Sequence, residues 1–397
     1  MKTKLIGLGL FALTATVIGI YPSLYSSAFG TVAHPPPRHT LTQSAEIEVV
    51  FVLDTTGSMD GLIATAKEKI WSIANTMAQS QQAPRISMGL VAYRDRGDGY
   101  VTQVVDLSSD LDTMYARLMD FKADGGGDGP ESVNLALRTA VEGISWSQNP
   151  NSYKAIFLVG DAPPHMDYGN EQRYPEILAA ATRKGIVVNA IQCGQMPQTT
   201  AHWTEIARLG NGRYLQVEQA GGAVAIATPF DADLAELSAE LDRTRMYYGT
   251  ESERAATETK LASAEKLEAD ASLSSRARRA VFNASASGAA SLFGERELLE
   301  DVAAGRVELA DIPQEELPAT LAALPAPAQA AAVEAEVKRR AELRQRIDEL
   351  AAERDDFISR EVGESGGAED SLDNRIYEMV RDQAAPKGLI YEGGPKF

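Results

Sequence analysis

The sequence predicts an α/β fold, a doubly wound and mostly parallel sheet with helices on both faces, followed by an α-helical C-terminal region. Between Glu46 and Val217, short apolar runs rich in Val and Ile alternate with segments whose apolar residues recur at helical spacing. Such alternation is typical of parallel sheets covered by helices on both faces. From about Ile226 the composition shifts to Ala, Glu and Arg without clear strands, which favours helices.

The predicted strands are continuous apolar runs bounded by polar turns. They are Ile47–Leu53, Ile86–Tyr93, Val101–Leu107, Tyr153–Val159, Ile186–Cys193 and Arg213–Val217. In sheets of this kind, ligands bind beyond the carboxyl ends of the strands. The loops that follow the strands are therefore where chemistry is expected.

The predicted helices share apolar residues spaced three and four apart. They are Gly61–Gln79, Leu111–Phe121, Glu131–Ile144, Tyr174–Lys184, Thr200–Leu209, Leu234–Met246, Lys260–Leu273, Ala328–Ile358 and Asn374–Asp382. Residues 226–362 are interpreted as an α-helical, coiled-coil-like extension. Residues 363–397 are interpreted as a flexible tail with one short helix, because Gly residues precede it.

Residues 1–28 are interpreted as an export signal. Lys2 and Lys4 precede an apolar run, Leu5–Ile20, and small residues follow it. An uncleaved N-terminal anchor is the open alternative, and only then would the chain touch a membrane. Residues 29–45 are rich in Pro and form an extended linker. The chain is therefore expected in the periplasm or outside the cell.

The overall composition narrows the class of partner. With 44% apolar and 24% charged residues, the chain is globular on average. Its net charge of −18 argues against nucleic acid, since phosphate-binding surfaces need clustered Lys and Arg. An acidic chain does suit divalent cations.

The first predicted strand ends in Asp54-Thr55-Thr56-Gly57-Ser58. Asp54, Thr56 and Ser58 place three hard oxygen ligands on one tight turn, the kind of donor that Mg²⁺ prefers. Asp161 follows the predicted strand Tyr153–Val159 in the same way. The alternative to a metal site is a polar turn without a metal, whose hydroxyls cap the following helix.

This arrangement resembles the von Willebrand factor type A domain, whose metal-ion-dependent adhesion site begins with Asp-x-Ser/Thr-x-Ser after the first strand. The resemblance covers about Glu46 to Val217 and implies a domain over residues 46–225. It implies Asp54, Thr56, Ser58 and Asp161 as metal ligands. Where many members have a Thr after paired glycines, this chain has Asp128, with Glu131 as the second candidate.

The resemblance implies a bound Mg²⁺, with Mn²⁺ or Ca²⁺ as alternatives. It also implies a protein partner that offers a carboxylate to an open position on the metal. A third carboxylate from Asp128 would neutralise the cation and weaken that attraction. Metal binding is therefore the better supported half of the expected adhesion role.

Two other classes of function stay open. In the first, the chain is a structural scaffold that acts through its helical C-terminal half. In the second, it is a metal-assisted hydrolase that uses Ser58, since Ser58, Asp161 and His165 follow the chain order of a catalytic triad. The nucleophile lacks the Gly-x-Ser-x-Gly elbow, so the sequence is interpreted as a non-enzymatic interaction module.

Overall fold

The computed structural model describes residues 45–127, 129–219, 226–365, 372–392 and 394. The predicted export signal, nearly all of the Pro-rich linker and Asp128 lie outside these residues. Within the described part of the chain, no helix combines the length and the apolar character needed to cross a bilayer.

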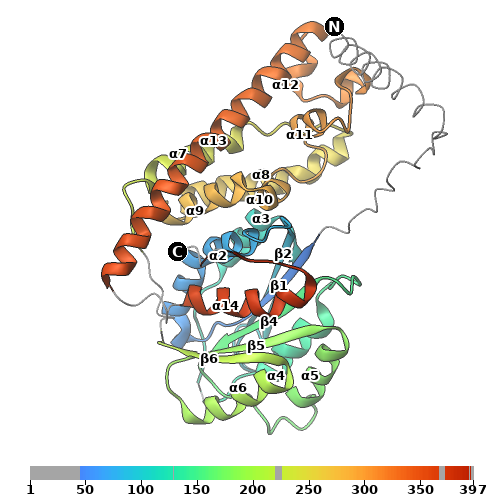
Figure 1. The fold of residues 1–397 in the computed structure, drawn as a ribbon. Helices are drawn as coiled ribbons and strands as arrows, with labels where there is room; N and C mark the ends of the chain where they lie inside the picture. Colours follow the sequence, from blue (N-terminus) through green and yellow to red (C-terminus); the bar gives the residue numbers. More distant parts are fainter. Residues whose placement is uncertain (1–44, 128, 220–225, 366–371, 393, 395–397) are drawn as a thin grey trace, which may run out of the picture. The chain divides into compact units, whose positions relative to one another are not determined.

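A six-stranded sheet has the strand order β3-β2-β1-β4-β5-β6 (Figure 1). Its strands are β1 Glu46–Asp54, β2 Arg85–Tyr93, β3 Thr102–Ser108, β4 Tyr153–Gly160, β5 Ile186–Cys193 and β6 Asn211–Val217. All neighbouring pairs are parallel except β2 and β3, which are antiparallel. The predicted α/β fold is therefore confirmed. The order reverses direction between β1 and β4, which creates the crevice where such sheets bind ligands.

Strand β1 is buried along its whole length and contributes side chains to two hydrophobic cores. Ile47, Val49 and Phe51 pack into the core on one face, while Val50 and Val52 pack into the core on the other. This alternation follows from the two-residue repeat of a strand. Burial of each such side chain stabilises the fold by about 1.5–3 kcal/mol. The packing of β1 therefore fixes the position of its last residue, Asp54.

Five helices follow strands of the sheet and cover its two faces (Figure 1). They are α2 Asp60–Ala78 and α3 Leu111–Asp120 on one face, and α4 Val133–Arg138, α5 Tyr174–Arg183 and α6 Pro197–Leu209 on the other. The helix predicted from Glu131 begins later, at Val133, because Glu131 instead forms a strand-like bridge with Pro164. Its last part, Thr139–Gly143, winds as a wider π turn.

The region after residue 226 is helical, as predicted. Its helices are α7 Asp231–Arg243, α8 Glu251–Asp270, α9 Leu273–Ala284, α10 Ala286–Phe293, α11 Leu298–Ala303, α12 Ala319–Ala322 and α13 Ala326–Ser365. Helix α9 was not expected from the sequence. It begins where the Ser272 hydroxyl accepts a hydrogen bond from the Ser275 N–H, and it packs against α7 and α2.

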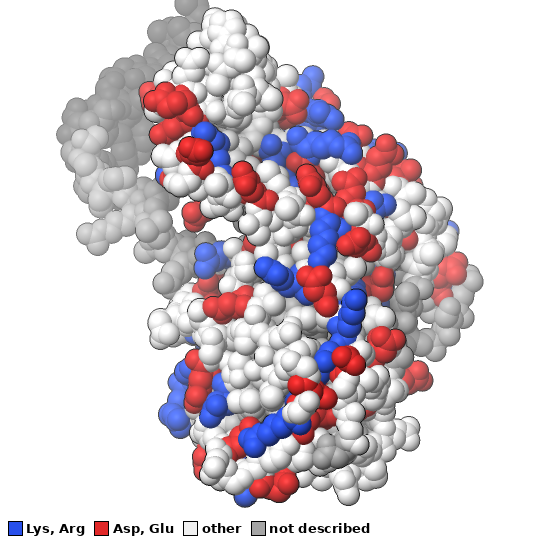
Figure 2. Space-filling view, turned by 180° about the vertical axis from the view of Figure 1, so that it is seen from behind, with Lys and Arg blue, Asp and Glu red and all other residues white. Residues whose placement is uncertain are grey.

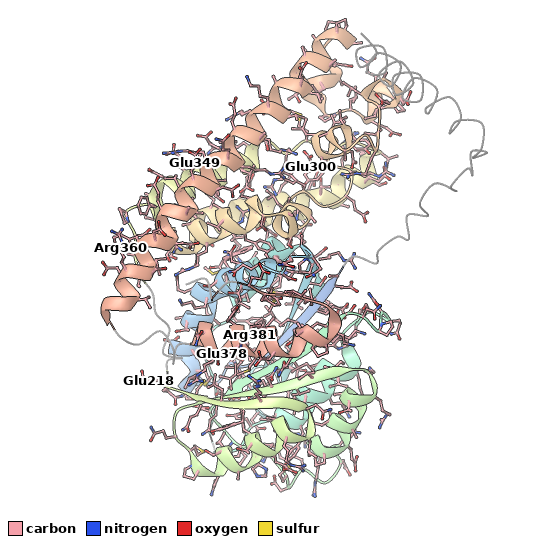
Figure 3. All side chains as sticks on the ribbon, viewed as in Figure 1. Glu218, Glu300, Glu349, Arg360, Glu378 and Arg381 are labelled. Atoms are coloured by element: carbon pink, nitrogen blue, oxygen red, sulfur yellow. The ribbon has the colours of Figure 1, made fainter. Side chains whose placement is uncertain are left out.

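Ion pairs hold the long helix α13 onto the shorter helices. Arg340 is 3% exposed and donates to Glu297, which is 1% exposed, at 2.8 Å. Arg340 and Arg344 both reach Glu300 of α11 at 3.1 Å. Figure 3 labels Glu300 within the helical region. Because Arg340 also donates to the Thr244 carbonyl at 2.7 Å, its guanidinium is satisfied within the helical region.

Helix α14, Leu372–Ala384, returns to the sheet after the helical region (Figure 1). Ile376, Met379 and Val380 are buried in the core that also contains α2 and one face of β1. The Gln383 side chain accepts from the Tyr153 hydroxyl at 2.8 Å and donates to Asn189 at 2.8 Å. The short helix predicted at Asn374–Asp382 therefore lies within an element of the sheet's own core.

Candidate metal site

Asp54 stands at the carboxyl end of β1, fully buried. The Thr56 N–H and hydroxyl both donate to its Oδ1, at 2.9 and 2.6 Å. Its Oδ2 accepts no hydrogen bond of standard geometry among the described residues, although the Tyr93 hydroxyl is near enough to lower the pKa of the carboxyl group. Burial raises the pKa of Asp54 to about 7, and the charge of Asp161 adds to the shift against the hydrogen bonds from Thr56. A buried carboxylate oxygen without a donor is costly unless something else supplies positive charge.

The hydroxyls of the first loop line up beside Asp54. The Thr56 Oγ1 lies 3.5 Å from the Ser58 Oγ, and Ser58 is exposed while Thr56 is 3% exposed. Arg94 stabilises the turn, because its side chain donates a hydrogen bond to the Thr55 carbonyl at 3.1 Å. The loop therefore presents a row of oxygens that runs from the core to the surface.

Backbone hydrogen bonds join three loops: the loop after β1, the loop between α3 and α4, and the loop after β4. The Gly57 N–H donates to the Gly125 carbonyl at 3.2 Å, and the Asp124 N–H donates to the Thr55 carbonyl at 3.1 Å. On its other side the second loop meets the third, since the Glu131 N–H donates to the Pro163 carbonyl at 2.9 Å. The loops that the sequence singled out separately are thus one connected unit.

Asp161 begins the third loop, directly after β4. Its carbonyl accepts from the Thr199 hydroxyl at 2.9 Å, which anchors it to α6. Its Oδ2 accepts from the Gln219 side-chain amide at 2.7 Å, and the same amide reaches the Ser58 carbonyl at 3.4 Å. Gln219 was not singled out from the sequence, although it follows β6, whose carboxyl end lies at the same edge of the parallel sheet as that of β4.

Glu131 contributes a further carboxyl group. It is 3% exposed, and its Oε2 has no partner within hydrogen-bond geometry among the described residues. Burial raises its pKa to about 9, and the negative charges of Asp54, Asp95, Asp98 and Asp161 raise it further. The sequence ranked Glu131 behind Asp128 as the ligand from this loop, and Asp128 lies outside the described residues.

His165 faces carboxylates on both ring nitrogens. Its Nδ1 lies 2.8 Å from Asp167 Oδ1, and its Nε2 lies 3.4 Å from Asp95 Oδ2. Its ring stacks on Tyr168, with 4.1 Å between centroids. Tyr168 in turn donates to Asp95 at 2.8 Å. This network joins the turn after β2 to the third loop and gives His165 a bracing role.

The donor set suits a hard cation. Asp54, Thr56, Ser58 and Asp161 offer only oxygen, and the unpartnered oxygens of Asp54 and Glu131 fit a divalent ion of the Mg²⁺ type. Among the described residues there is no group of three or more His, Cys, Asp or Glu side chains arranged to hold a metal. Within the part of the chain that the structure describes, the hydroxyls of Thr56 and Ser58 are therefore needed to complete the donor set.

Fold and loops together define an α/β domain with an oxygen-rich site at the switch point of its sheet. Residues 48–229 match the family model described as von Willebrand factor A domain. This part of the chain is a von Willebrand factor A domain.

Several relatives share this domain. The chain is 40% identical over 114 residues to von Willebrand factor A domain-containing protein 7 of Rattus norvegicus. This match covers 29% of this chain and 12% of that protein. It is 27% identical over 120 residues to the alpha-protein kinase vwkA of Dictyostelium discoideum, covering 30% of this chain and 19% of the kinase. It is 24% identical over 207 residues to Hemicentin-2 of Mus musculus, and the match covers 52% of this chain and 4% of Hemicentin-2. The chain thus spans under a fifth of each of these relatives.

Two solved structures are similar to the same part of the chain. The SpRpn10 VWA domain has 15% sequence identity and a TM-score of 0.34, over 44% of this chain and 89% of that one. The von Willebrand factor type A protein from Catenulispora acidiphila has 18% identity and a TM-score of 0.34, over 45% and 39%.

Proposed function

We propose that this chain is a divalent-cation-dependent protein-binding module that acts outside the cytoplasm. The cation, Mg²⁺ in the first instance, is held at the end of β1 by Asp54, Thr56, Ser58 and Asp161, with Asp128 or Glu131 as the carboxylate from the second loop. The partner supplies a carboxylate to the exposed side of the cation. No catalytic role is assigned to Ser58.

The observation that carries this proposal is the buried Oδ2 of Asp54, which accepts no hydrogen bond of standard geometry among the described residues and has only the Tyr93 hydroxyl near it as a donor. It lies at the meeting point of three loops that are bonded to one another through their backbones. Ser58 is exposed at the outer end of the oxygen row, so an incoming group has access. Von Willebrand factor A domains commonly mediate protein–protein interaction, which agrees with this use of the site.

Partner capture tests the proposal. The full chain is immobilised and exposed to an extract of its source organism, either in Mg²⁺ or in excess chelator. Partners that are recovered in Mg²⁺, and lost on chelation and in Asp161→Ala, support cation-dependent binding. Partners that survive both changes would instead support a scaffold acting through the helices after residue 226.

Export rests on the sequence of residues 1–28, which lie outside the described residues. Fractionation of cells that produce the full chain, with mass spectrometry of its N-terminus, tests this part. A chain that begins at Met1 in the cytoplasmic fraction would contradict export, and it would leave the metal site unaffected.

Gly160→Ala should damage the site without touching any oxygen ligand. A Cβ at Gly160 would lie 2.5 Å from the Tyr93 hydroxyl and 3.0 Å from the Asp54 Oδ2, so Asp54 or Tyr93 must move. We expect the free energy of unfolding to fall by about 1–3 kcal/mol, because this is the typical cost of adding a methyl group to a well-packed core. Mg²⁺ affinity should also fall, and both are measured by chemical denaturation and calorimetry.

Gly169→Ala is the matched control, because a Cβ there would meet nothing within 4 Å. It lies in the third loop, close in sequence to Asp161. If Gly160→Ala kept full stability and Mg²⁺ affinity, Asp54 would not need the position described here.

A further inference from the structure

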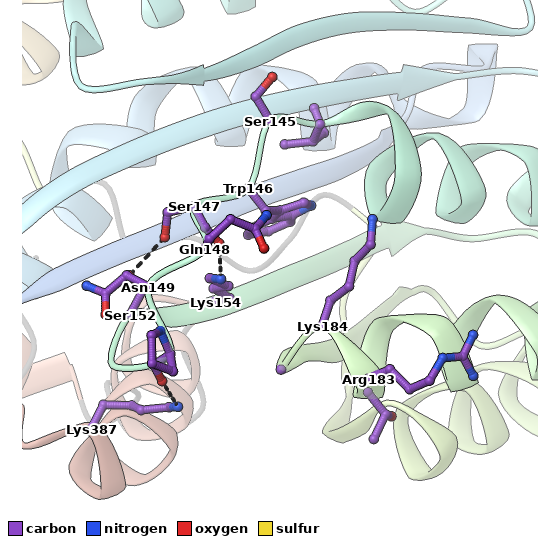
Figure 4. A pocket seen from close by; sticks show the side chains of 14 residues that line it. Ser145, Trp146, Ser147, Gln148, Asn149, Ser152, Lys154, Arg183, Lys184 and Lys387 are labelled. Carbon is purple, nitrogen blue, oxygen red and sulfur yellow. Dashed lines mark hydrogen bonds between the residues drawn. The ribbon is translucent and has the colours of Figure 1, made fainter.

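A cavity of about 690 Å³ lies at the amino ends of β4 and β5 (Figure 4). The candidate metal site is at the carboxyl ends, so the two sites are at opposite edges of the sheet. Three segments far apart in sequence form the cavity: the loop Ile144–Ser152, the turn Thr182–Gly185 and the C-terminal Lys387. Its volume falls in the range of small-molecule sites, about 300–1,000 Å³.

The side chains that line this cavity include four cations and no carboxylate. The cations are Lys154, Arg183, Lys184 and Lys387. In a chain with net charge −18, such a grouping does not follow from composition. On the face seen in Figure 2, Lys and Arg are instead intermixed with Asp and Glu. The cavity is therefore a local positive site on an acidic protein.

These cations keep their charge available. Lys184 donates to the Val141 carbonyl at 2.6 Å, and Lys387 donates to the Pro150 carbonyl at 2.6 Å. Lys154 donates to the Ser147 carbonyl in the same way. A carbonyl orients an ammonium group but does not neutralise it, and each ammonium has three donors. Among the described residues, none of the four lining cations forms an ion pair.

Three carboxyl groups lie close by. Glu46 of β1 accepts from the Ser152 hydroxyl at 2.5 Å, and Asp106 of β3 accepts from the Ser145 N–H at 2.8 Å. Glu48 of β1 is the cross-strand neighbour of Lys154 and accepts from the Ser147 N–H at 3.0 Å. It is 4% exposed, and burial raises its pKa although Ser147 and Lys154 oppose the shift. None of the three carboxyl residues lines the cavity, and Glu46 is also paired with Arg85 at 2.7 Å. They offset part of the charge of the four cations, and the lining itself stays cationic.

Two lining residues are fixed in place. Lys154 is 7% exposed and stands on β4. Trp146 is also 7% exposed, and its Nε1–H donates to the Ala140 carbonyl at 2.8 Å, which locks the indole in the wall. Lys184 and Lys387 are exposed, come from two other segments, and extend toward the carbonyls of Val141 and Pro150 (Figure 4). A fixed floor with adjustable cations at the rim suits a ligand that carries several negative charges.

We propose that this cavity binds a small oxyanion with two or more phosphate or carboxylate groups. The ammonium groups of Lys154, Lys184 and Lys387 are placed to donate to separate oxygens, and charge-assisted hydrogen bonds of this kind are the stronger class. Because Lys387 follows α14, a bound oxyanion would also tie the C-terminal segment to the loops before β4 and β5. The proposal is independent of the metal site.

Calorimetric titration of the full chain tests it, with pyrophosphate and citrate as probes at constant ionic strength. Chelator is present throughout, so the metal site takes no part. We expect saturable binding at one site per chain and a rise in melting temperature with probe concentration. Lys184→Gln and Lys387→Gln should each weaken binding about tenfold, the usual effect of losing one charge-assisted hydrogen bond.

Lys338→Gln is the matched control, since Lys338 is an exposed cation of α13 far along the chain from the cavity. It should leave affinity unchanged. Stronger binding of pyrophosphate assigns a phosphate ligand, and stronger binding of citrate assigns a polycarboxylate. No saturable binding of either probe, or an equal loss in Lys338→Gln, overturns the proposal.

Discussion

Asp54→Ala should abolish Mg²⁺ binding, with a loss of affinity greater than about a hundredfold. Removing a residue that only supports a metal ligand typically lowers metal affinity about 10–100-fold. Asp54 is a proposed ligand and offers the only buried carboxylate of the first loop, so its loss should cost more. The measurement is calorimetric titration of Mg²⁺ and Mn²⁺ into the purified chain.

Two further variants guard this test. Asp54 also accepts two hydrogen bonds from Thr56, so its loss can disturb the loop itself. Ser58→Ala removes an exposed hydroxyl at the outer end of the oxygen row and should weaken binding in a chain with native circular dichroism. Asp270→Ala removes an exposed carboxylate at the end of α8 and should change nothing. Mg²⁺ binding that survives both Asp54→Ala and Ser58→Ala would refute the proposed metal site.

Arg279→Met should lower the free energy of unfolding by about 3–5 kcal/mol, the cost of breaking a buried ion pair by removing one partner. Arg279 of α9 is 3% exposed and donates to Asp112 of α3 at 2.7 Å. It also donates to Asp242 of α7 at 2.8 and 2.9 Å. One guanidinium thus joins two helices of the helical region to a helix of the sheet. Without it, Asp112 would be left charged and buried.

Urea denaturation followed by circular dichroism measures this loss. Arg346→Met is the control, because Arg346 is an exposed residue of α13 whose partner, Glu349, lies three positions along the same helix. Its effect should stay within about 0.5 kcal/mol. Equal stabilities of the two variants would show that the Arg279 cluster does not hold the helices to the sheet.

The same cluster predicts a loss of stability in acid. Burial alone would raise the pKa of Asp112, but the adjacent Arg279 charge outweighs it and lowers the pKa from 3.8 to about 2. A carboxyl group whose pKa is lower in the folded chain stabilises the fold above its unfolded pKa. That contribution is therefore complete above about pH 4 and is lost as the pH falls toward 2. In Arg279→Met, this part of the acid dependence should disappear.

The sheet could be predicted from the sequence because its signal is local. Strands such as Ile47–Leu53 are apolar runs, and burial of both faces requires nothing else. Helix α9 escaped prediction because Arg278 and Arg279 indicate an exposed surface, whereas both are buried here. Their burial depends on distant partners such as Asp112, and no local pattern encodes those.

The candidate site divides in the same way. Asp54, Thr56 and Ser58 lie on one turn, so their spacing alone predicts convergence. Gln219 reaches Asp161 because β6 runs parallel to β4, which spacing within a single loop does not encode. Glu131 turns inward because its backbone pairs with the third loop. The basic cavity is less visible still, since one of its cations, Lys387, lies more than two hundred residues after the other three.

Helix α14 makes the sheet domain discontinuous along the chain. The family match ends at residue 229, yet Ile376, Met379, Val380 and Leu389 complete one of the two cores of the sheet. A fragment cut at residue 229 would uncover the apolar side chains of α2 and the sheet that these residues cover. Such exposed surface promotes aggregation. Expression plasmids for this domain therefore need the C-terminal helix and also the helical region, because Leu267 and Phe282 belong to the same core.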